Sequence, residues 1–431
     1  MRRYCLLLLM VLGLAQIAWA QPFPDPYRYP EDRTMMGGLG MTWIDDQAYT
    51  TLTLAPDLAF GKWGVGIYLQ LLFNNEDGFK FRKDEYQDGA GILRAIRYIR
   101  YAQKYDPYYF RVGSLDRAIL GNGFLMWNYN NQSNYDKRKI GLVADVDLNQ
   151  FGFESVMSNF GSSDLQGVNL YVRPFRFAQE PMPILNKLRV YTTYIRDNNV
   201  ADEPLTDTTF TENSLSAFGF GVDLMWLDLK LINSTVYADY SKFSDFGNGK
   251  AVGIRVVFPE FIGLFGLAAR LEKRFNGEQF VPSLFGPLYD LQRQLGGTSS
   301  IFTQLRNTPK TEGIFGELAG HVIQKVQLIG SFQKLNGIRN SGILHVEANA
   351  PDLVPRFELR GYYDKINVET FKDVRTLDIN SVLTADIGYE LNNYLLLSVI
   401  YRWYWLEEPG NPGVYKPVER VEPRLSFRYN F

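Results

Sequence analysis

Short segments along this 431-residue chain alternate apolar and polar residues with a period of two. The clearest are residues 64–71, 140–148, 252–258 and 395–405. Because successive side chains of a β-strand point to opposite faces, each segment predicts a strand with one apolar and one polar face. A membrane-spanning helix needs roughly 20 consecutive apolar residues, and no such run occurs after the N-terminal segment, so a bundle of membrane helices is excluded.

Aromatic residues are abundant, yet the chain as a whole is not strongly apolar. It contains 27 Tyr, 30 Phe and 7 Trp, while the mean hydropathy is −0.19. A membrane β-barrel combines these properties, because its strands alternate lipid-facing and lumen-facing residues and their average hydropathy stays low. A disordered chain is excluded, since 46% of the residues are apolar and the net charge is only −2.

The N-terminal residues have the pattern of an export signal. Residues 1–20 begin with Arg2 and Arg3, continue with an apolar run and end in Ala-Trp-Ala, which predicts a cleaved signal peptide. The alternative, a membrane anchor, needs a longer apolar run. Cleavage would remove Cys5, the only cysteine, so the exported chain would have no disulfide, Cys metal site or Cys nucleophile. Residues 21–35 carry four prolines and predict an extended periplasmic tail.

The last eight residues also form an alternating strand. Leu425, Phe427, Tyr429 and Phe431 share one face, and Arg424, Ser426, Arg428 and Asn430 share the other. In this the chain resembles the outer-membrane β-barrel proteins of Gram-negative bacteria, of the porin type. The resemblance implies location in the outer membrane and an assembly signal, read by the outer-membrane assembly machinery, made of Phe427, Tyr429 and Phe431. The alternative is a soluble β-sandwich that ends in an edge strand.

The connections between the predicted strands alternate between short and long, as a barrel with tight periplasmic turns and longer outer loops requires. The sequence therefore predicts an all-β fold, in which residues 36–431 form a single transmembrane antiparallel up-and-down β-barrel with long extracellular loops. We expect about 18–20 strands, within a range of roughly 16–20, and an even number puts both termini in the periplasm.

A barrel of this width is too large for its own side chains to fill, so its interior either holds water or is closed by loops. The connection from Leu115 to Tyr135 carries more large apolar residues than a loop in water should. The family resemblance implies that this loop, the third outer loop, folds inward and narrows the lumen. The alternative is a surface loop covered by other loops or by a partner. The predicted constriction residues are Leu120, Asn122, Phe124, Trp127 and Asn131.

A second long connection, residues 276–311, has leucines at helical spacing over Leu288–Leu295, followed by two glycines. It predicts a short helix, either as a cap over the pore or within an ordinary ordered loop.

Charged residues of both signs lie on the predicted lumen faces. Opposed Arg and carboxylate groups would create a transverse field that filters polar solutes, although they equally well pair with each other to hold the barrel's shape. The predicted pore-lining residues are Arg100, Arg111, Asp145, Asp147, Glu154, Arg173, Asp223, Arg255, Arg270, Glu272, Arg274, Glu347, Glu358, Arg360 and Arg402.

No motif predicts an enzyme. The only histidines, His321 and His345, have carboxylates nearby, and we expect them to pair with these. We predict no catalytic residues, no metal site and no cofactor. Nucleic acid is not an expected partner, because there is no basic excess.

The functional hypothesis is a porin-type channel through which small polar solutes diffuse. The alternative is a non-conducting receptor or structural barrel within a cell-envelope complex. Expected partners are outer-membrane lipid and lipopolysaccharide, the assembly machinery and small polar solutes. The solute, the direction of transport, the oligomeric state and any envelope-complex partner stay open at this point.

Overall fold

The structure is a computed structural model of the chain. It describes residues 34–44, 47–74, 80–81, 95–104, 106–115, 117–131, 139–180, 182–200, 214–261, 265–293, 301–322, 326–351, 353–407 and 415–430.

The described residues form 23 strand segments and a few short helices. The first strands are β1 (Thr34–Ile44), β2 (Gln47–Leu54), β3 (Asp57–Phe60), β4 (Trp63–Ile67), β5 (Leu69–Asn74), β6 (Lys80–Phe81), β7 (Ile96–Tyr101), β8 (Tyr108–Gly113), β9 (Gly141–Asp147), β10 (Phe151–Met157), β11 (Leu165–Val172) and β12 (Leu188–Asp197). The others are β13 (Leu215–Leu229), β14 (Ile232–Phe243), β15 (Asn248–Phe261), β16 (Phe265–Asn276), β17 (Thr311–Val322), β18 (Val326–Leu335), β19 (Gly342–Pro351), β20 (Phe357–Val368), β21 (Ser381–Asn392), β22 (Leu395–Glu407) and β23 (Tyr415–Asn430). The helices are η2 (Pro174–Phe177), η3 (Leu185–Lys187), α3 (Tyr289–Gln292), α4 (Ile301–Asn307) and α5 (Phe371–Val374).

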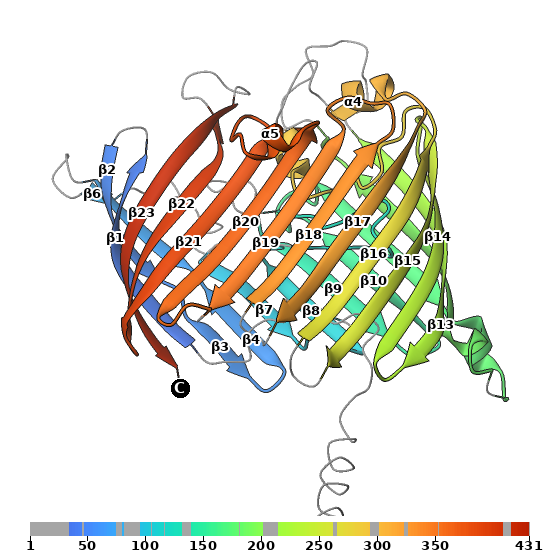
Figure 1. Cartoon of the computed structure of the whole chain (residues 1–431), viewed down its shortest axis with the longest axis horizontal. Coiled ribbons are helices and arrows are strands. Elements are labelled where there is room, and N and C mark those ends of the chain that lie inside the picture. Colours follow the sequence, from blue (N-terminus) through green and yellow to red (C-terminus); the bar gives the residue numbers. More distant parts are fainter. Residues whose placement is uncertain are drawn as a thin grey trace, which may run out of the picture.

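The strands pair antiparallel in one sheet whose two ends meet (Figure 1). β1 pairs with β2 and also, over Thr34–Gly40, with the final strand β23. β2 pairs with β5, β3 with β4, and β4 with β7. From β7 onward each strand pairs with the next one in the chain. The ladders thus lead from β1 around to β23 and back to β1.

The number of strands around the barrel is smaller than the number of segments. β2 and β3 are two parts of one strand, and β4 and β5 are two parts of the next, interrupted at Tyr68. Among the described residues β6 pairs only with β5, so it adds no strand to the circumference. Counted in this way, the described chain forms 20 strands. The antiparallel all-β barrel predicted from the two-residue alternation is confirmed.

The two ends of the barrel differ in their connections. Thr34 at the start of β1 pairs with Asn430 at the end of β23, so the first strand begins and the last one ends at the same end of the barrel. Most connections at this end are short, such as residues 61–62 and 230–231, and we call it the turn end. The opposite end, which we call the loop end, carries the long connections, among them residues 114–140 and 277–310.

The outer surface of the barrel is apolar. Phe220, Leu271 and Ile387 are 60%, 57% and 54% exposed, while the next residues along each strand turn to the other face. Apolar surface spread around the whole barrel is stable in lipid and unstable in water. This is the surface that a membrane-spanning barrel presents to the bilayer. No helix in the described part of the chain is long and apolar enough to cross a membrane.

Two boundaries differ from the sequence prediction. β1 begins at Thr34, so the last two residues of the tail predicted over 21–35 belong to the first strand. Residues 1–33, which include the predicted signal peptide, lie outside the described residues. Pro259-Glu260 has the residue types of a short turn, and the alternation of the neighbouring strands predicts one near these residues. The structure places the reversal three residues later, because β15 continues through Pro259 and Glu260 and Phe261 pairs with Phe265. A register shift between Phe258 and Phe261 accommodates the proline, as bulges do in antiparallel sheets.

The ladder between β1 and β23 should not tolerate a side chain at Gly40. A Cβ there would lie 2.5 Å from the carbonyl oxygen of Pro423, which is rigid backbone. We expect Gly40→Ala to lower the free energy of unfolding by about 1–3 kcal/mol. The measurement is urea unfolding of the refolded barrel, with heat-modifiable migration on gels as the test of folding. Gly316→Ala, where the nearest atom is 4.0 Å away, is the control. Equal stability of the two variants would contradict the prediction.

Candidate functional site

One loop, residues Leu115–Asn131, bonds to many of the strands, and we call it the inner loop. The amide of Gly121 donates to Glu154 of β10 at 2.8 Å, and the side-chain amide of Asn122 donates to the Tyr191 hydroxyl of β12 at 2.9 Å. Arg255 of β15 donates back to the Asn122 oxygen at 3.2 Å. These two bonds connect the loop to two strands through Asn122, whose side chain is buried.

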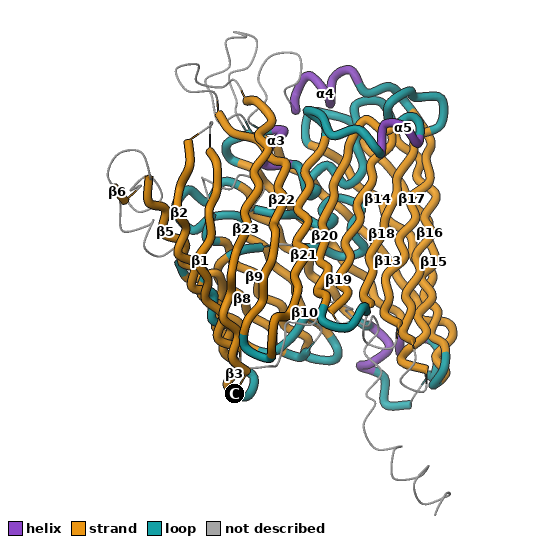
Figure 2. The backbone as a smooth tube through the Cα atoms, turned by 60° about the vertical axis from the view of Figure 1, so that its left-hand side comes forward, coloured by secondary structure: helices purple, strands orange, loops and turns teal. Residues whose placement is uncertain are grey.

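The second half of the inner loop bonds to strands further around the barrel. The Trp127 indole nitrogen donates to Glu317 of β17 at 2.6 Å. The Asn128 amide lies 3.0 Å from a ring nitrogen of His345 on β19, and Asn130 donates to the Tyr362 hydroxyl of β20 at 3.4 Å. The loop residues therefore bond to strands from β10 to β20. Figure 2 shows loop segments, drawn in teal, between the walls of strands.

The inner loop packs against the second long connection, residues 277–310, which we call the helical loop. The backbone amides of Ser283 and Phe285 donate to the carbonyls of Phe124 and Leu125 at 2.8 and 3.2 Å. The two loops share an apolar cluster with neighbouring strands. Its loop members include Leu120, Phe124, Leu125, Met126, Phe280, Leu284, Phe285, Tyr289, Ile301, Phe302 and Leu305. The apolar residues that drew attention in the sequence are therefore buried, as a loop in water requires.

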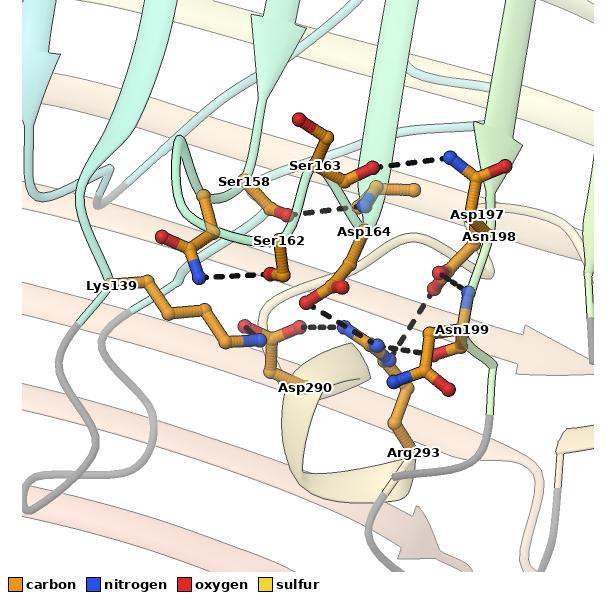
Figure 3. Close-up of polar contacts among 12 residues, drawn as sticks. Lys139, Ser158, Ser162, Ser163, Asp164, Asp197, Asn198, Asn199, Asp290 and Arg293 are labelled. Carbon is orange, nitrogen blue, oxygen red and sulfur yellow. Dashed lines mark hydrogen bonds and ion pairs between the residues drawn. The ribbon is translucent and has the colours of Figure 1, made fainter. Parts of the chain in front are cut away.

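The helical loop is fixed by buried charges near the loop end of the barrel (Figure 3). Arg293 lies 3.4 Å from both Asp290 and Asp197, and Lys139 bonds to Asp290 at 3.0 Å. The Tyr289 hydroxyl donates to Asp197 at 2.7 Å, and burial together with this carboxylate raises the pKa of Tyr289. The phenol thus stays protonated and keeps its bond. The helix α3 (Tyr289–Gln292) lies within the short helix predicted over Leu288–Leu295, and residues 294 and 295 lie outside the described residues.

Three predicted pore-lining residues form one buried cluster on β16. Glu272 is fully buried and accepts bonds from Arg270 at 2.8 Å and from Arg274 at 2.5 Å. The Tyr237 hydroxyl donates to the same carboxylate at 2.8 Å. Both guanidinium groups lie over the Phe315 ring, at 4.6 and 4.4 Å. These three charges pair with each other, which is the arrangement expected of residues that hold the shape of the barrel.

A second cluster is centred on a residue that the sequence analysis missed. Glu422 of β23 bonds to the predicted Arg402 at 2.7 Å, to Arg424 at 3.2 Å, and also to Arg420. Its carboxylate is buried, so it needs these cations. Glu422 shares the inward phase of Arg424, so extending the alternation of the last strand back by two residues would have identified it.

The remaining predicted pore-lining residues have polar neighbours; all lie on inner faces of strands except Arg173, which directly follows β11. Charge pairs join Asp145 with Lys104 (2.9 Å), Asp147 with Arg173 (2.8 Å), Asp223 with Arg189 (2.7 Å), Glu347 with His345 (3.0 Å) and Glu358 with Arg360 (3.7 Å). Arg100 donates to the Ala102 carbonyl at 3.0 Å, and Arg111 to the Ser114 hydroxyl at 3.2 Å. The predicted loop residue Asn131 donates to the Ser158 carbonyl at 2.8 Å.

Arg360 differs from the buried charges. It shares the inner face of β20 with Glu358, yet its side chain is 54% exposed. Across the ladder it pairs with Asp386 of β21, another charged residue. An exposed guanidinium on an inner face requires water beside it. This part of the wall therefore faces a hydrated space.

The two histidines lie on different strands, β17 and β19. His345 is buried, with Asp364 at 2.8 Å and Glu347 at 3.0 Å from its two ring nitrogens. The expected pairing with carboxylates is thus present for His345. In the described ranges no group of three or more His, Cys, Asp or Glu side chains is arranged to hold a metal ion.

No family model matches the chain, and no curated protein matches it. Solved structures are similar over most of its length. Pseudomonas aeruginosa OccK2 (OpdF) in complex with glucuronate is 9% identical, with 93% of this chain and 96% of that chain covered and a TM-score of 0.34. A BenF-like porin from Pseudomonas fluorescens Pf-5 is 12% identical, with coverages of 93% and 97% and a TM-score of 0.35. The outer membrane protein opdK from Pseudomonas aeruginosa is 9% identical, with coverages of 93% and 99% and a TM-score of 0.31. At these values the likeness carries no argument about function.

Removing the charge of Glu272 should destabilise the barrel strongly. Glu272→Gln keeps the shape but leaves Arg270 and Arg274 buried without their carboxylate, and we expect a loss of about 3–5 kcal/mol in the free energy of unfolding. The control is Glu312→Gln, which breaks the exposed pair with Lys273 and should cost less than about 1 kcal/mol. Urea unfolding in detergent measures both. A loss for Glu272→Gln as small as that of the control would show that the cluster adds no stability.

Proposed function

We propose that this protein is a porin-type channel of the bacterial outer membrane, through which small polar solutes diffuse passively, and that the inner loop narrows its lumen. The observation that carries the proposal is the combination of an apolar outer surface with charged inner faces on a barrel of this width. Twenty strands enclose more space than their own side chains fill. The space left beside the inner loop is then a path for water and solutes.

The contacts of the inner loop support its role as the constriction. Its bonds to Glu154, Tyr191, Glu317 and Tyr362 come from strands on several sides of the barrel. A loop bonded in this way keeps its position while solutes pass. The exposed Arg360 supports a wet passage on the side of β20 and β21. The predicted pore-lining residues near it are Glu358 on the same strand and Arg402 two strands away.

A non-conducting barrel within an envelope complex is the second candidate. The observation in its favour is the apolar cluster that joins the two loops, because this core occupies space beside β8 to β15. Planar bilayers separate the two functions. Steady ohmic steps from the folded barrel support a channel. Absence of conductance from barrels that migrate as folded, heat-modifiable protein supports the second candidate.

A thiol reagent should block the channel from one inner position. Cys5 is the only cysteine, so a chain that starts at Gln21 carries a single thiol when Arg360→Cys is introduced. We expect a charged methanethiosulfonate to react with this thiol and to lower the single-channel conductance. The control is Val399→Cys, whose side chain points outward and is 45% exposed to the lipid side. If labelling at 360 leaves the conductance unchanged, the path does not pass this wall.

Loosening the inner loop should change the current. Asn122→Ala combined with Trp127→Ala removes the bonds to Tyr191, Arg255 and Glu317. We expect larger or noisier single-channel conductance, because the loop then leaves its position more often. Ser162→Ala, on an exposed turn, is the control. A double variant that folds and conducts as the unmodified protein does would rule out the inner loop as the constriction.

A further inference from the structure

Cations gather on the outer surface near the loop end of β12, β14 and β15. Arg196 is the last residue but one of β12, Lys242 the last but one of β14, and Lys250 the third residue of β15. All three are exposed, while their neighbours along the chain, Asp197, Phe243 and Gly249, are buried. These cations, which we call the outer basic patch, therefore point away from the interior and take no part in the proposed passage.

Apolar residues continue directly from the outer basic patch toward the middle of the barrel. Lys242 pairs with Phe218 on β13, and Lys250 pairs with Tyr240 on β14. Phe218 and Phe220 are 49% and 60% exposed. The patch thus lies where the lipid-facing surface ends, which is the level of the lipid headgroups.

Two of these cations are not neutralised by the described residues. Further along the same rim, Lys273 pairs with Glu312, and Lys334 pairs with Glu369. Lys242 and Lys250, by contrast, make no ion pair or side-chain hydrogen bond with any residue in the described ranges. Their strands are adjacent and the residues are offset by two positions, which sets their Cα atoms roughly 7–8 Å apart. Two lysines at this distance form a site of concentrated positive charge.

A polar hollow of about 450 Å³ adjoins the patch. It is lined mainly by Arg196, Asn198, Ser214, Ser216, Ser244 and Asp245. Hydroxyl and amide groups of this kind bond to sugar hydroxyls, and Arg196 is suited to phosphate. Asp245 would repel an anion, so charge alone does not select the occupant of the hollow. The mixture of hydroxyl, amide and guanidinium groups does.

On β22 and β23 the described outward positions near the loop end carry no cation. Toward the loop end, β22 presents Tyr401 and Trp403, and β23 presents Glu419 and Val421. Aromatic residues there match an ordinary membrane interface. The outer basic patch is therefore a local feature and not a belt around the whole barrel.

We propose that the outer basic patch and the adjoining hollow bind one phosphorylated glycolipid of the outer leaflet. Lys242 and Lys250 would bind its phosphate groups, the hollow would hold its sugar headgroup, and the acyl chains would lie along Phe218 and Phe220. A free phosphate would leave the apolar part of this surface unused, and a phospholipid without sugar would leave the hollow unused. The inference rests on the proposed placement in the outer membrane, but it does not depend on conduction.

The test is a titration of the folded full-length barrel in detergent with bisphosphorylated lipid A, followed by native mass spectrometry. We expect one bound lipid, and Lys242→Gln/Lys250→Gln should weaken binding about 30-fold, at about a factor of five for each cation near a membrane surface. The matched control is Lys230→Gln/Arg356→Gln, which removes two exposed cations at the turn end. Equal binding by both double variants would overturn the proposal.

Three further probes identify the chemistry that is recognised. Dephosphorylated lipid A should bind much more weakly, and neither phosphatidylglycerol nor inorganic phosphate should compete. Equal affinity for phosphatidylglycerol would overturn a glycolipid site, and competition by inorganic phosphate would reduce it to a free-anion site. Single-channel recordings separate this result from the channel proposal, because Lys242→Gln/Lys250→Gln should conduct normally. A protein that binds lipid A but never conducts would refute the channel and leave the glycolipid site standing.

Discussion

A backbone that crosses hydrocarbon has no water to bond with, so every strand must find partners for its amides and carbonyls on both edges. The ladder between β1 and β23 meets this requirement, since it joins the two edges that any sheet would otherwise leave open. Most other features follow from it. The closed sheet fixes a wide interior, that interior needs loops, water or paired charges to fill it, and the outer surface becomes free to be apolar.

The alternation of apolar and polar residues was sufficient to predict the barrel. Successive side chains of a barrel strand face the outer surface and the interior in turn, so apolar and polar residues alternate along it. The alternation was less informative where the backbone leaves ideal geometry. Pro259 reads as a turn residue, yet it lies in a bulged strand, and the interruption at Tyr68 divides one strand into two segments. The bulge and the interruption do not follow from hydropathy. They follow from how the backbones of neighbouring strands pair, and the pattern of residue types does not encode this pairing.

The interior was harder to predict than the fold, for a physical reason. The alternation identifies which residues point inward, but whether two of them meet depends on the register between strands. Arg270, Glu272 and Arg274 share one face of β16, so their proximity follows from the alternation alone. Only the register between strands places Tyr237 and Phe315 in line with Glu272. Glu422 was missed although it shares the inward phase of Arg424, and its importance follows from the three arginines that surround it. The apolar content of the inner loop, by contrast, was visible in the sequence, since large apolar residues in a long loop must be buried somewhere.

The two long loops are joined by backbone hydrogen bonds and by the bond from Ser283 to the Gly123 carbonyl, between residues 160 positions apart in the chain. The inner loop is therefore positioned as much by a neighbouring surface loop as by the wall. Because loops accept insertions and substitutions more readily than paired strands do, the helical loop is a place where variation can move the inner loop without touching a single strand. Under the proposed function, the bore of the barrel would be adjustable from the loop end, while the paired strands stay constant.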